Sequence, residues 1–233
     1  MLDTSNCKEN SLDPDLARVA ILLADNKIKY WLCHGTLLGL MRDGQLIPWD
    51  NDIDIACWKN EALRTEIMTL MDKNGYRLIH DGEGYDFLTF QGNGERKIDF
   101  NFYHDNGAGL AYSNWFVSRN KLAGLLLGLE NRAKELNIGS KRISLIYRKL
   151  ILTPFVGLLK ILKNRNLLYR SAGYSTPVHL LDELTDLQID DISLSIPKKY
   201  ESVLQFLYGA DWKIPKQNYN WVVDSGSTIV SKK

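Results

Sequence analysis

The stretch that decides the fold is His34-Gly35-Thr36-Leu37-Leu38-Gly39-Leu40-Met41-Arg42, followed by Ile47-Pro48-Trp49-Asp50-Asn51-Asp52-Ile53-Asp54-Ile55. The first run predicts a strand end that turns into a helix, with Thr36 as its cap and with Gly35 and Gly39 allowing the backbone to approach a ligand closely. The N-terminus of such a helix presents N–H groups that can hold a phosphate. We therefore expect a phosphate-binding turn at residues 34–42.

The second run predicts a strand in which acidic and apolar residues alternate. Ile53 and Ile55 should point to one face of the sheet, and Asp52 and Asp54 to the other. Carboxylates that share a face repel each other unless a cation lies between them, and a divalent metal is the natural candidate. A solvated Asp-x-Asp pattern is the alternative, but alternation with isoleucine inside a strand favours a site.

A third carboxylate lies in another predicted strand, residues 97–104. Asp99 and Asn101 should share one face of this strand. The opposite face is apolar and consists of Ile98, Phe100 and Phe102. An isolated strand Asp is more often an edge or ion-paired residue. Because a pair of acids precedes it in the sequence, Asp99 is nevertheless a candidate third ligand of the same metal.

The run Gly-Thr-Leu-Leu-Gly, then Arg42, then Ile-Pro-Trp-Asp-x-Asp-Ile-Asp-Ile resembles the LicD/fukutin family of phosphotransferases, a branch of the nucleotidyltransferase fold. The resemblance covers about residues 17–105 and, less closely, residues 192–216. It implies a nucleotidyltransferase-like α/β (α+β) fold. In such a fold a small mixed sheet is flanked by helices, and this protein adds a basic helical insertion.

The resemblance also implies an activity. Such an enzyme transfers a phospho-alcohol group, phosphocholine or a similar polyol phosphate, from a CDP-linked donor to a hydroxyl of a cell-surface glycan and releases CMP. Asp52, Asp54 and Asp99 would be the catalytic residues and the ligands of Mg²⁺ or, alternatively, Mn²⁺. Asp99 could also help to deprotonate the acceptor hydroxyl. Four further residues would bind or orient the donor: Gly35, Thr36, Arg42 and Asp50. For Arg42, an ion pair with Asp43 or Asp50 is the structural alternative.

Three other functions fit the same carboxylates. A nucleotidylyltransferase would release pyrophosphate instead of CMP, so product analysis separates the two. A metal-dependent glycosyltransferase should carry a longer nucleotide-binding half before its Asp-x-Asp motif than the roughly fifty residues that precede it here. A degenerate domain would bind nucleotide or act as a scaffold, against which the intact set of three acids argues. The sequence does not name the phospho-alcohol, the acceptor or the oligomeric state.

Composition indicates a globular, cytoplasmic protein. Of the 233 residues, 45% are hydrophobic and 24% are charged, which argues against disorder. The three cysteines, Cys7, Cys33 and Cys57, lack metal-ligand spacing and favour a reducing compartment. The N-terminus lacks the basic and apolar parts of a signal peptide. No run approaches the roughly 18 apolar residues of a membrane span.

The net charge of +1 hides an uneven distribution. Residues 110–176 hold 12 Lys and Arg against 2 Asp and Glu, whereas residues 1–109 hold 11 against 18. We therefore divide the protein into a catalytic core (1–109), a basic, leucine-rich helical insertion (110–176), and a C-terminal helix and tail that pack on the core (177–233).

The basic insertion has three interpretations. The first is a helical subdomain with a solvated face. The second is a surface for anionic lipid on the inner face of the membrane, where a lipid-linked glycan acceptor would be presented. The third is a surface for a phosphate-bearing acceptor. Nucleic acid is not an expected partner, since no recognisable nucleic-acid-binding module is present. The basic residues among its Leu and Ile are Lys141, Arg142, Arg148, Lys149, Lys160, Lys163 and Arg165.

Capping residues and apolar spacing predict three further elements of the core and its C-terminal extension. A helix should begin at Asp13-Pro14 and end near Asn26, and a second should follow the cap Asn60 and stop at Asn74-Gly75. A third helix should begin at Pro197 and end at Gly209. We expect this last helix to play a structural role against the sheet.

Overall fold

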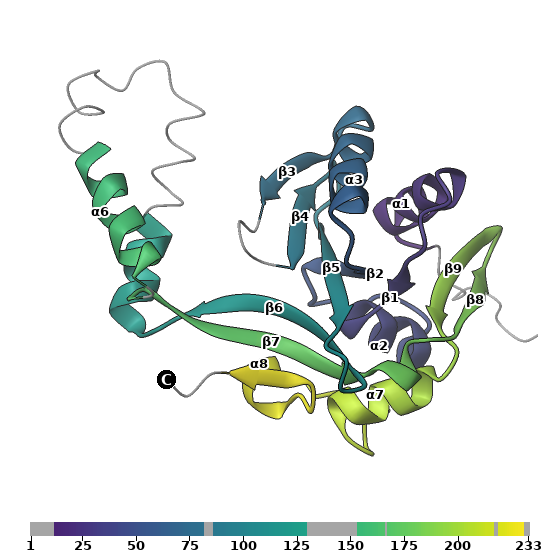
Figure 1. Cartoon of the computed structure of the whole chain (residues 1–233). Helices are drawn as coiled ribbons and strands as arrows, with labels where there is room; N and C mark the ends of the chain where they lie inside the picture. Colours follow the sequence, from purple (N-terminus) through teal and green to yellow (C-terminus); the bar gives the residue numbers. More distant parts are fainter. Residues whose placement is uncertain (1–11, 82–85, 130–152, 166, 217–218, 231–233) are drawn as a thin grey trace, which may run out of the picture. The chain divides into compact units, whose positions relative to one another are not determined.

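The computed structural model describes residues 12–81, 86–129, 153–165, 167–216 and 219–230. The protein divides into two compact units (Figure 1). Unit 1 consists of residues 1–115 and 173–229, and unit 2 consists of residues 116–172 and 230–233. Three strands have residues in both units: β6 (Leu110–Ser118), β7 (Tyr169–Pro177) and β10 (Thr228–Val230).

The described elements follow one another in this order: α1 (Pro14–Asp25), β1 (Trp31–Leu32), α2 (His34–Asp43), β2 (Asp52–Trp58), α3 (Glu61–Lys73), β3 (Arg77–His80), β4 (Phe87–Gln91), β5 (Lys97–Asp105), β6 (Leu110–Ser118), α6 (Thr153–Asn164), β7 (Tyr169–Pro177), the 3₁₀ turn η2 (Val178–Leu180), β8 (Leu184–Ile189), β9 (Ile192–Pro197), α7 (Tyr200–Tyr208), α8 (Trp221–Asp224) and β10 (Thr228–Val230).

The first helix, α1, forms where the sequence predicts it. The Asp13 carboxylate caps it by accepting the N–H groups of Asp15 (3.0 Å) and Leu16 (3.3 Å), and Pro14 fits the first turn. The helix α3 is also confirmed, since the Asn60 side chain accepts the N–H of Ala62 at 2.9 Å. The buried face of α1 is the predicted one: Leu16, Val19, Ala20 and Leu23.

The sheet is mixed, as predicted, and β5 lies at its centre. β2 runs parallel to β5 and antiparallel to β1, and the β2–β5 register places Asp54 beside Asp99. The other edge of β5 is shared: β4 pairs with residues 97–101, and β6 pairs with residues 104–105. This register brings carboxylates from two distant parts of the sequence onto neighbouring strands.

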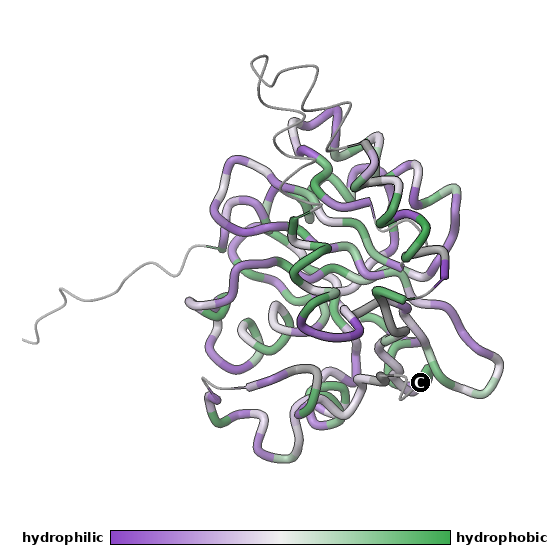
Figure 2. The backbone as a smooth tube through the Cα atoms, turned by 90° about the vertical axis from the view of Figure 1, so that its left-hand side faces the viewer, coloured by the Kyte–Doolittle hydropathy of each residue, from purple (hydrophilic) through white to green (hydrophobic). Residues whose placement is uncertain are grey.

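The apolar faces of β2 and β5 form the middle of the core. Ile53, Ile55, Ile98 and Phe100 are fully buried, whereas the acids on the opposite face, Asp52, Asp54 and Asp99, are only partly buried. The predicted alternation is therefore confirmed. Figure 2 shows the hydrophobic backbone segments (green) concentrated where strands lie side by side, with hydrophilic segments (purple) mostly in the loops.

Residues 110–176 are helical only in part, which differs from the expected helical insertion. The two ends are the strands β6 and β7, and the described helices cover residues 121–129 and α6. The strand β6 forms because its residues alternate, with Ala111 and Ser113 buried. Among the described residues, no helix is both long enough and apolar enough to cross a bilayer. Four residues of the predicted basic cluster lie outside the described part of the protein: Lys141, Arg142, Arg148 and Lys149.

The C-terminal helix α7 begins later than predicted. Pro197 ends β9, whose residues alternate and pair with β8, and the helix begins at Tyr200. A proline suits the end of a strand because it has no N–H to donate to the ladder. Gly209 ends the helix at φ 90°, as predicted. The buried face of α7 consists of Val203, Leu204 and Leu207. The helix packs against α2 and β9.

Candidate active site

A cavity of about 440 Å³ in unit 1 is lined by the polar face of β2 and β5, a volume typical of small-molecule sites. Its lining has an acidic part and a largely aromatic part. The acidic part consists of Asp50, Asp52, Asp54 and Asp99. The aromatic residues that line it are His34, Trp49, Phe87, Trp115, Tyr174, Tyr208, Trp212 and Tyr219.

Residues at the start of α2 hold Asp54 in place through hydrogen bonds. Its backbone carbonyl accepts the N–H of Cys33 (3.2 Å), and its own N–H donates to the Thr36 hydroxyl (2.7 Å). The N–H of Gly35 donates to the Asp54 carboxylate. The expected capping role of Thr36 is therefore wrong, because α2 begins two residues earlier and the buried Thr36 hydroxyl holds β2 instead. The predicted contact of Gly35 and Thr36 with a diphosphate stays a prediction.

The two glycines of the turn allow different parts of the protein to come close to the backbone of α2. A Cβ on Gly35 would collide with the carboxylate of Asp50, so this glycine makes room for an acidic group of the site. A Cβ on Gly39 would meet the backbone of Gln45 and Ile47, at 2.7 and 2.9 Å. Gly39 therefore lets α2 pack against the loop that leads to β2, which differs from the expected role of approaching a ligand.

Asp50 is positioned by Arg96, a residue that no sequence motif indicated. The guanidinium of Arg96 donates to the backbone carbonyls of Asp50 (3.2 Å) and Ile47 (3.4 Å). It also pairs with the carboxylate of Asp13 at 2.9 Å. Arg96 thus ties the loop of residues 47–50 to the first turn of α1, and no sequence pattern marks such a contact.

Burial and mutual repulsion raise the pKa of three acids. Burial is the main cause for each, and the charge of Asp52 adds to it. The pKa of Asp54 is well above its usual value, and that of Asp50 is raised to about 7, also through a hydrogen bond with Asp52. The pKa of Asp99 is raised to about 6, although the Thr89 hydroxyl and Lys97 lower it. Such a group of acids strongly attracts cations.

The acidic group consists of side chains of the type that can bind a divalent cation. Carboxylate oxygens are the ligands that Mg²⁺ and Mn²⁺ prefer. Oδ1 of Asp99 is buried and has no hydrogen-bond partner among the described residues, so it is available as a ligand. Across the described ranges, however, no three His, Cys, Asp or Glu side chains already form a metal-binding group. A bound cation would have to draw these carboxylates together.

Arg42 lines the cavity and is also engaged by its neighbour in the sequence. Its Nε and Nη2 donate to the two carboxylate oxygens of Asp43, at 2.9 and 2.6 Å, and its side chain is only 6% exposed. The structural alternative stated for Arg42, an ion pair with Asp43, is present in the structure. A diphosphate clamp by Arg42 stays a prediction.

His34 forms part of the aromatic lining. Its backbone adopts φ 45°, which residues with a side chain rarely do. The ring packs against Tyr174 in a tilted arrangement at a centroid distance of 4.2 Å, and Nε2 lies 3.1 Å from the Tyr103 hydroxyl. Burial lowers the pKa of His34 to about 4, so the ring is neutral at pH 7. Trp115 stacks on the same tyrosine at 5.4 Å, which extends the aromatic lining.

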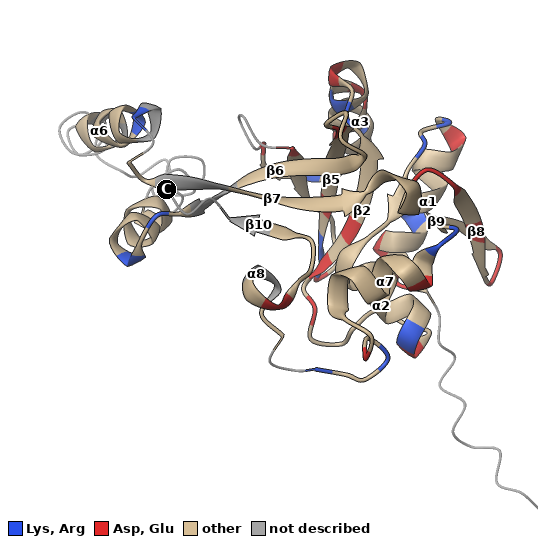
Figure 3. Ribbon diagram, turned by 60° about the horizontal axis from the view of Figure 1, so that its bottom comes forward, with Lys and Arg blue, Asp and Glu red and all other residues tan. Residues whose placement is uncertain are grey.

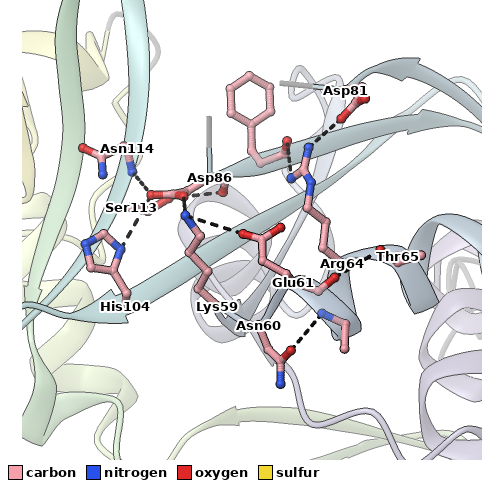
Figure 4. A network of polar contacts seen from close by, with 12 residues as sticks. Lys59, Asn60, Glu61, Arg64, Thr65, Asp81, Asp86, His104, Ser113 and Asn114 are labelled. Atoms are coloured by element: carbon pink, nitrogen blue, oxygen red, sulfur yellow. Dashed lines mark hydrogen bonds and ion pairs between the residues drawn. The ribbon is translucent and has the colours of Figure 1, made fainter. Parts of the chain in front are cut away.

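Asp86 fixes the junction at which β4 and β6 share the edge of β5 (Figure 4). Its carboxylate, 3% exposed, accepts from Lys59 Nζ and the Asn114 N–H, both at 2.8 Å. Its backbone carbonyl accepts the N–H of Phe102 at 2.6 Å, and its own N–H donates to the carbonyl of Asn114 at 2.8 Å. The next residues on the two strands, Phe87 and Trp115, line the cavity. Asp86 therefore sets the position of one part of the lining.

Comparisons with known proteins identify the family of the segment that carries these acids. Residues 27–123 match the model of the family described as "LicD/FKTN/FKRP, nucleotidyltransferase domain". This segment is a LicD-type nucleotidyltransferase domain. It contains all four acids of the cavity, and the expected family resemblance is thereby confirmed.

Relatives of the LicD-type segment come from bacteria and mammals. The protein is 34% identical over 84 residues to an uncharacterised protein of Rickettsia typhi, covering 36% of this sequence and 25% of that protein. It is 34% identical over 100 residues to the ribitol 5-phosphate transferase FKRP of Mus musculus and 30% identical over 93 residues to the mouse ribitol-5-phosphate transferase FKTN. These two matches cover 40% and 39% of this sequence, and 20% of each relative. The protein thus matches a quarter or less of the length of these relatives.

Among solved structures, the lincosamide antibiotic adenylyltransferase LnuA bound to lincomycin superposes with a TM-score of 0.43 and 12% identity. The superposition covers 84% of this protein and 87% of that one.

The cavity extends beyond the LicD-type segment. The acids and Trp115 lie within residues 27–123, whereas Tyr174 and the residues contributed by α7 and the segment after it lie outside. The expectation of a purely structural C-terminal helix is too narrow, because Leu207 and Tyr208 of α7 line the cavity. These two residues lie within residues 192–216, the second stretch that resembles the family in sequence.

Proposed function

We propose that this protein transfers a phospho-alcohol group, ribitol phosphate or phosphocholine, from a CDP-linked donor to a hydroxyl of a glycan and releases CMP. The observation that carries the proposal is the meeting of Asp50, Asp52, Asp54 and Asp99 at one cavity of a LicD-type domain. The relatives FKRP and FKTN, named as ribitol phosphate transferases, support this class of reaction.

The residues of the cavity suit the parts of such a donor. Asp52, Asp54 and Asp99 would hold Mg²⁺ or Mn²⁺, which when bound neutralises charge on the diphosphate as CMP departs. Exposed aromatic side chains of the lining such as Trp49, which is 51% exposed, offer faces on which a cytosine ring can stack. The surrounding lining would exclude water and hold the donor while the acceptor hydroxyl attacks its distal phosphorus.

The direct test is product analysis with the whole protein. Purified protein is incubated with Mg²⁺, a panel of CDP-alcohols and candidate glycans, and the nucleotide products are resolved by chromatography. Release of CMP together with glycan-bound phosphate supports the proposal. Asp54→Asn should lose this activity, while Asp72→Asn, the same change at an exposed position of α3, should keep it.

Other products would overturn the proposal. Pyrophosphate released from CTP would indicate a nucleotidylyltransferase, and transfer of a sugar from a nucleotide-sugar would indicate a glycosyltransferase. A rise in melting temperature with CDP-alcohols but no turnover with any acceptor tried would favour a nucleotide-binding scaffold. Omitting Mg²⁺ and adding EDTA tests the expected metal dependence in the same assay.

A further inference from the structure

The two described helices of unit 2 carry apolar side chains on both sides. One residue from each helix, Ala123 and Leu159, forms a small buried core with Leu168, which follows α6 in the sequence. The other sides of the two helices are exposed, and the spacing of three and four residues along the first helix gives a continuous stripe. Six large apolar side chains of this unit are between 42% and 64% exposed: Leu122, Leu125, Leu129, Leu158, Ile161 and Leu167.

Positive charge accompanies this apolar surface, and the described residues of the unit add no negative charge to it. Residues 116–129 and 153–172 contain six Lys and Arg and no Asp or Glu. Figure 3 shows this as blue without red on α6 and on the helix of residues 121–129. Lys121, Lys160 and Arg165 are exposed beside the apolar side chains. A merely solvated face would not require the exposed leucines, which are costly in water.

We propose that this surface of unit 2, defined by the six exposed apolar residues with Lys121, Lys160 and Arg165, docks on an anionic lipid bilayer. Apolar side chains that enter the headgroup boundary, with basic residues around them, are the pattern of interfacial helices. A second copy of the protein fits this surface less well. A symmetric contact through it would bring equal positive charges together, which is unfavourable.

The test is flotation of the full-length protein with vesicles. Wild type should bind vesicles of phosphatidylcholine with about 30% phosphatidylserine at low salt and leave phosphatidylcholine vesicles largely unbound. Lys121→Gln with Lys160→Gln should weaken binding about 25-fold, from roughly fivefold per basic residue. Salt at about 0.5 M should remove most of the charge-dependent part, because it shortens the screening length.

The apolar part is tested separately. Leu122→Ser, Leu125→Ser and Leu158→Ser combined should weaken vesicle binding at least about tenfold, since each removes an inserted side chain. Matched controls lie in unit 1: Ile21→Ser, which is 48% exposed, and the pair Lys29→Gln and Lys73→Gln, both exposed. These controls should bind like wild type, and circular dichroism should show the same fold for every variant.

Three outcomes would overturn the proposal. They are failure of wild type to bind anionic vesicles at low salt, unchanged binding by the leucine variant, and equal loss in the unit 1 controls. Light scattering measures the oligomeric state and so tests whether a second copy of the protein occupies this surface instead. If wild type dimerises without lipid, and the leucine variant is monomeric with no change in vesicle binding, the surface is a contact between two copies of the protein.

Discussion

Asp54 is the most constrained acid of the site. Contacts from Cys33, Gly35 and Thr36 hold its backbone and carboxylate, and its pKa is strongly raised. We predict that Asp54→Asn lowers turnover by more than roughly 10–100-fold. That range is the usual loss when a residue that only orients a metal ligand is removed, and Asp54 would bind the metal directly. The variant should be at least as stable as wild type in EDTA, because a repelling charge is removed. Steady-state rates and melting temperatures test both, and retained Mg²⁺-dependent turnover would contradict the assignment.

Asp99 should make stability depend on pH. Its pKa is about 6 in the folded protein and 3.8 when unperturbed, so the folded state binds the proton more tightly. The stabilisation from this group is fully present below about pH 4 and is lost as the pH rises through 6. A shift of about two units corresponds to roughly 3 kcal/mol.

Asp99→Asn removes that dependence. In EDTA, the free energy of unfolding of the variant relative to wild type should therefore rise between pH 4 and 6 and level off above. The low pKa of His34 acts in the opposite direction in this range, but it is common to both proteins and cancels in the difference. Urea unfolding at a series of pH values measures this, and a difference that stays flat with pH would show that Asp99 titrates normally.

At the level of elements, Arg96 joins the loop of residues 47–50 to α1. We predict that Arg96→Lys lowers stability by about 1–2 kcal/mol and raises the KM for the donor, because an ammonium cannot reach the carbonyls of Ile47 and Asp50 and the Asp13 carboxylate together. The matched control is Arg77→Lys at an exposed position of β3. Equal behaviour of the two variants in urea unfolding and donor kinetics would mean that Arg96 does not hold the loop.

The sequence predicted those elements whose local pattern and tertiary role agree. α1 and α3 have their own caps, and the acids of β2 and β5 are recognisable because polar residues interrupt apolar strands. The start of α7 was misplaced because Pro197 suits both the end of a strand and the start of a helix. Only pairing with β8 decides between them.

The aromatic lining and Arg96 could not be predicted from local patterns. Trp115, Tyr174 and Tyr208 meet through the fold, and no periodicity links residues so far apart in the sequence. Arg96 acts on carbonyls 46 and 49 residues away. Thr36 is a residue type that often caps a helix, but α2 already begins at His34, two residues before it. Its hydroxyl instead accepts the N–H of Asp54 in β2.

For the whole molecule, the two units differ sharply in the size of their cores. The buried cluster of unit 1 extends over α1, the sheet and α7, whereas that of unit 2 consists, among the described residues, of Ala123, Leu159 and Leu168. Regions with few buried apolar residues open at lower free energy than the global unfolding. We therefore predict that amides of α6 and of residues 121–129 exchange with solvent hydrogen much faster than those of β2 and β5.

The same measurement separates the two proposals made for this protein. Mg²⁺ with a CDP-alcohol should slow exchange in the segments that line the cavity and leave the helices of unit 2 unchanged, because a ligand protects what it binds. Anionic vesicles should slow exchange in the helices of unit 2 and leave β2 and β5 unchanged. Protection of both units by either ligand would mean that they open together, as one cooperative unit. Uniform exchange in the free protein would contradict the expected difference in stability, whatever the ligands do.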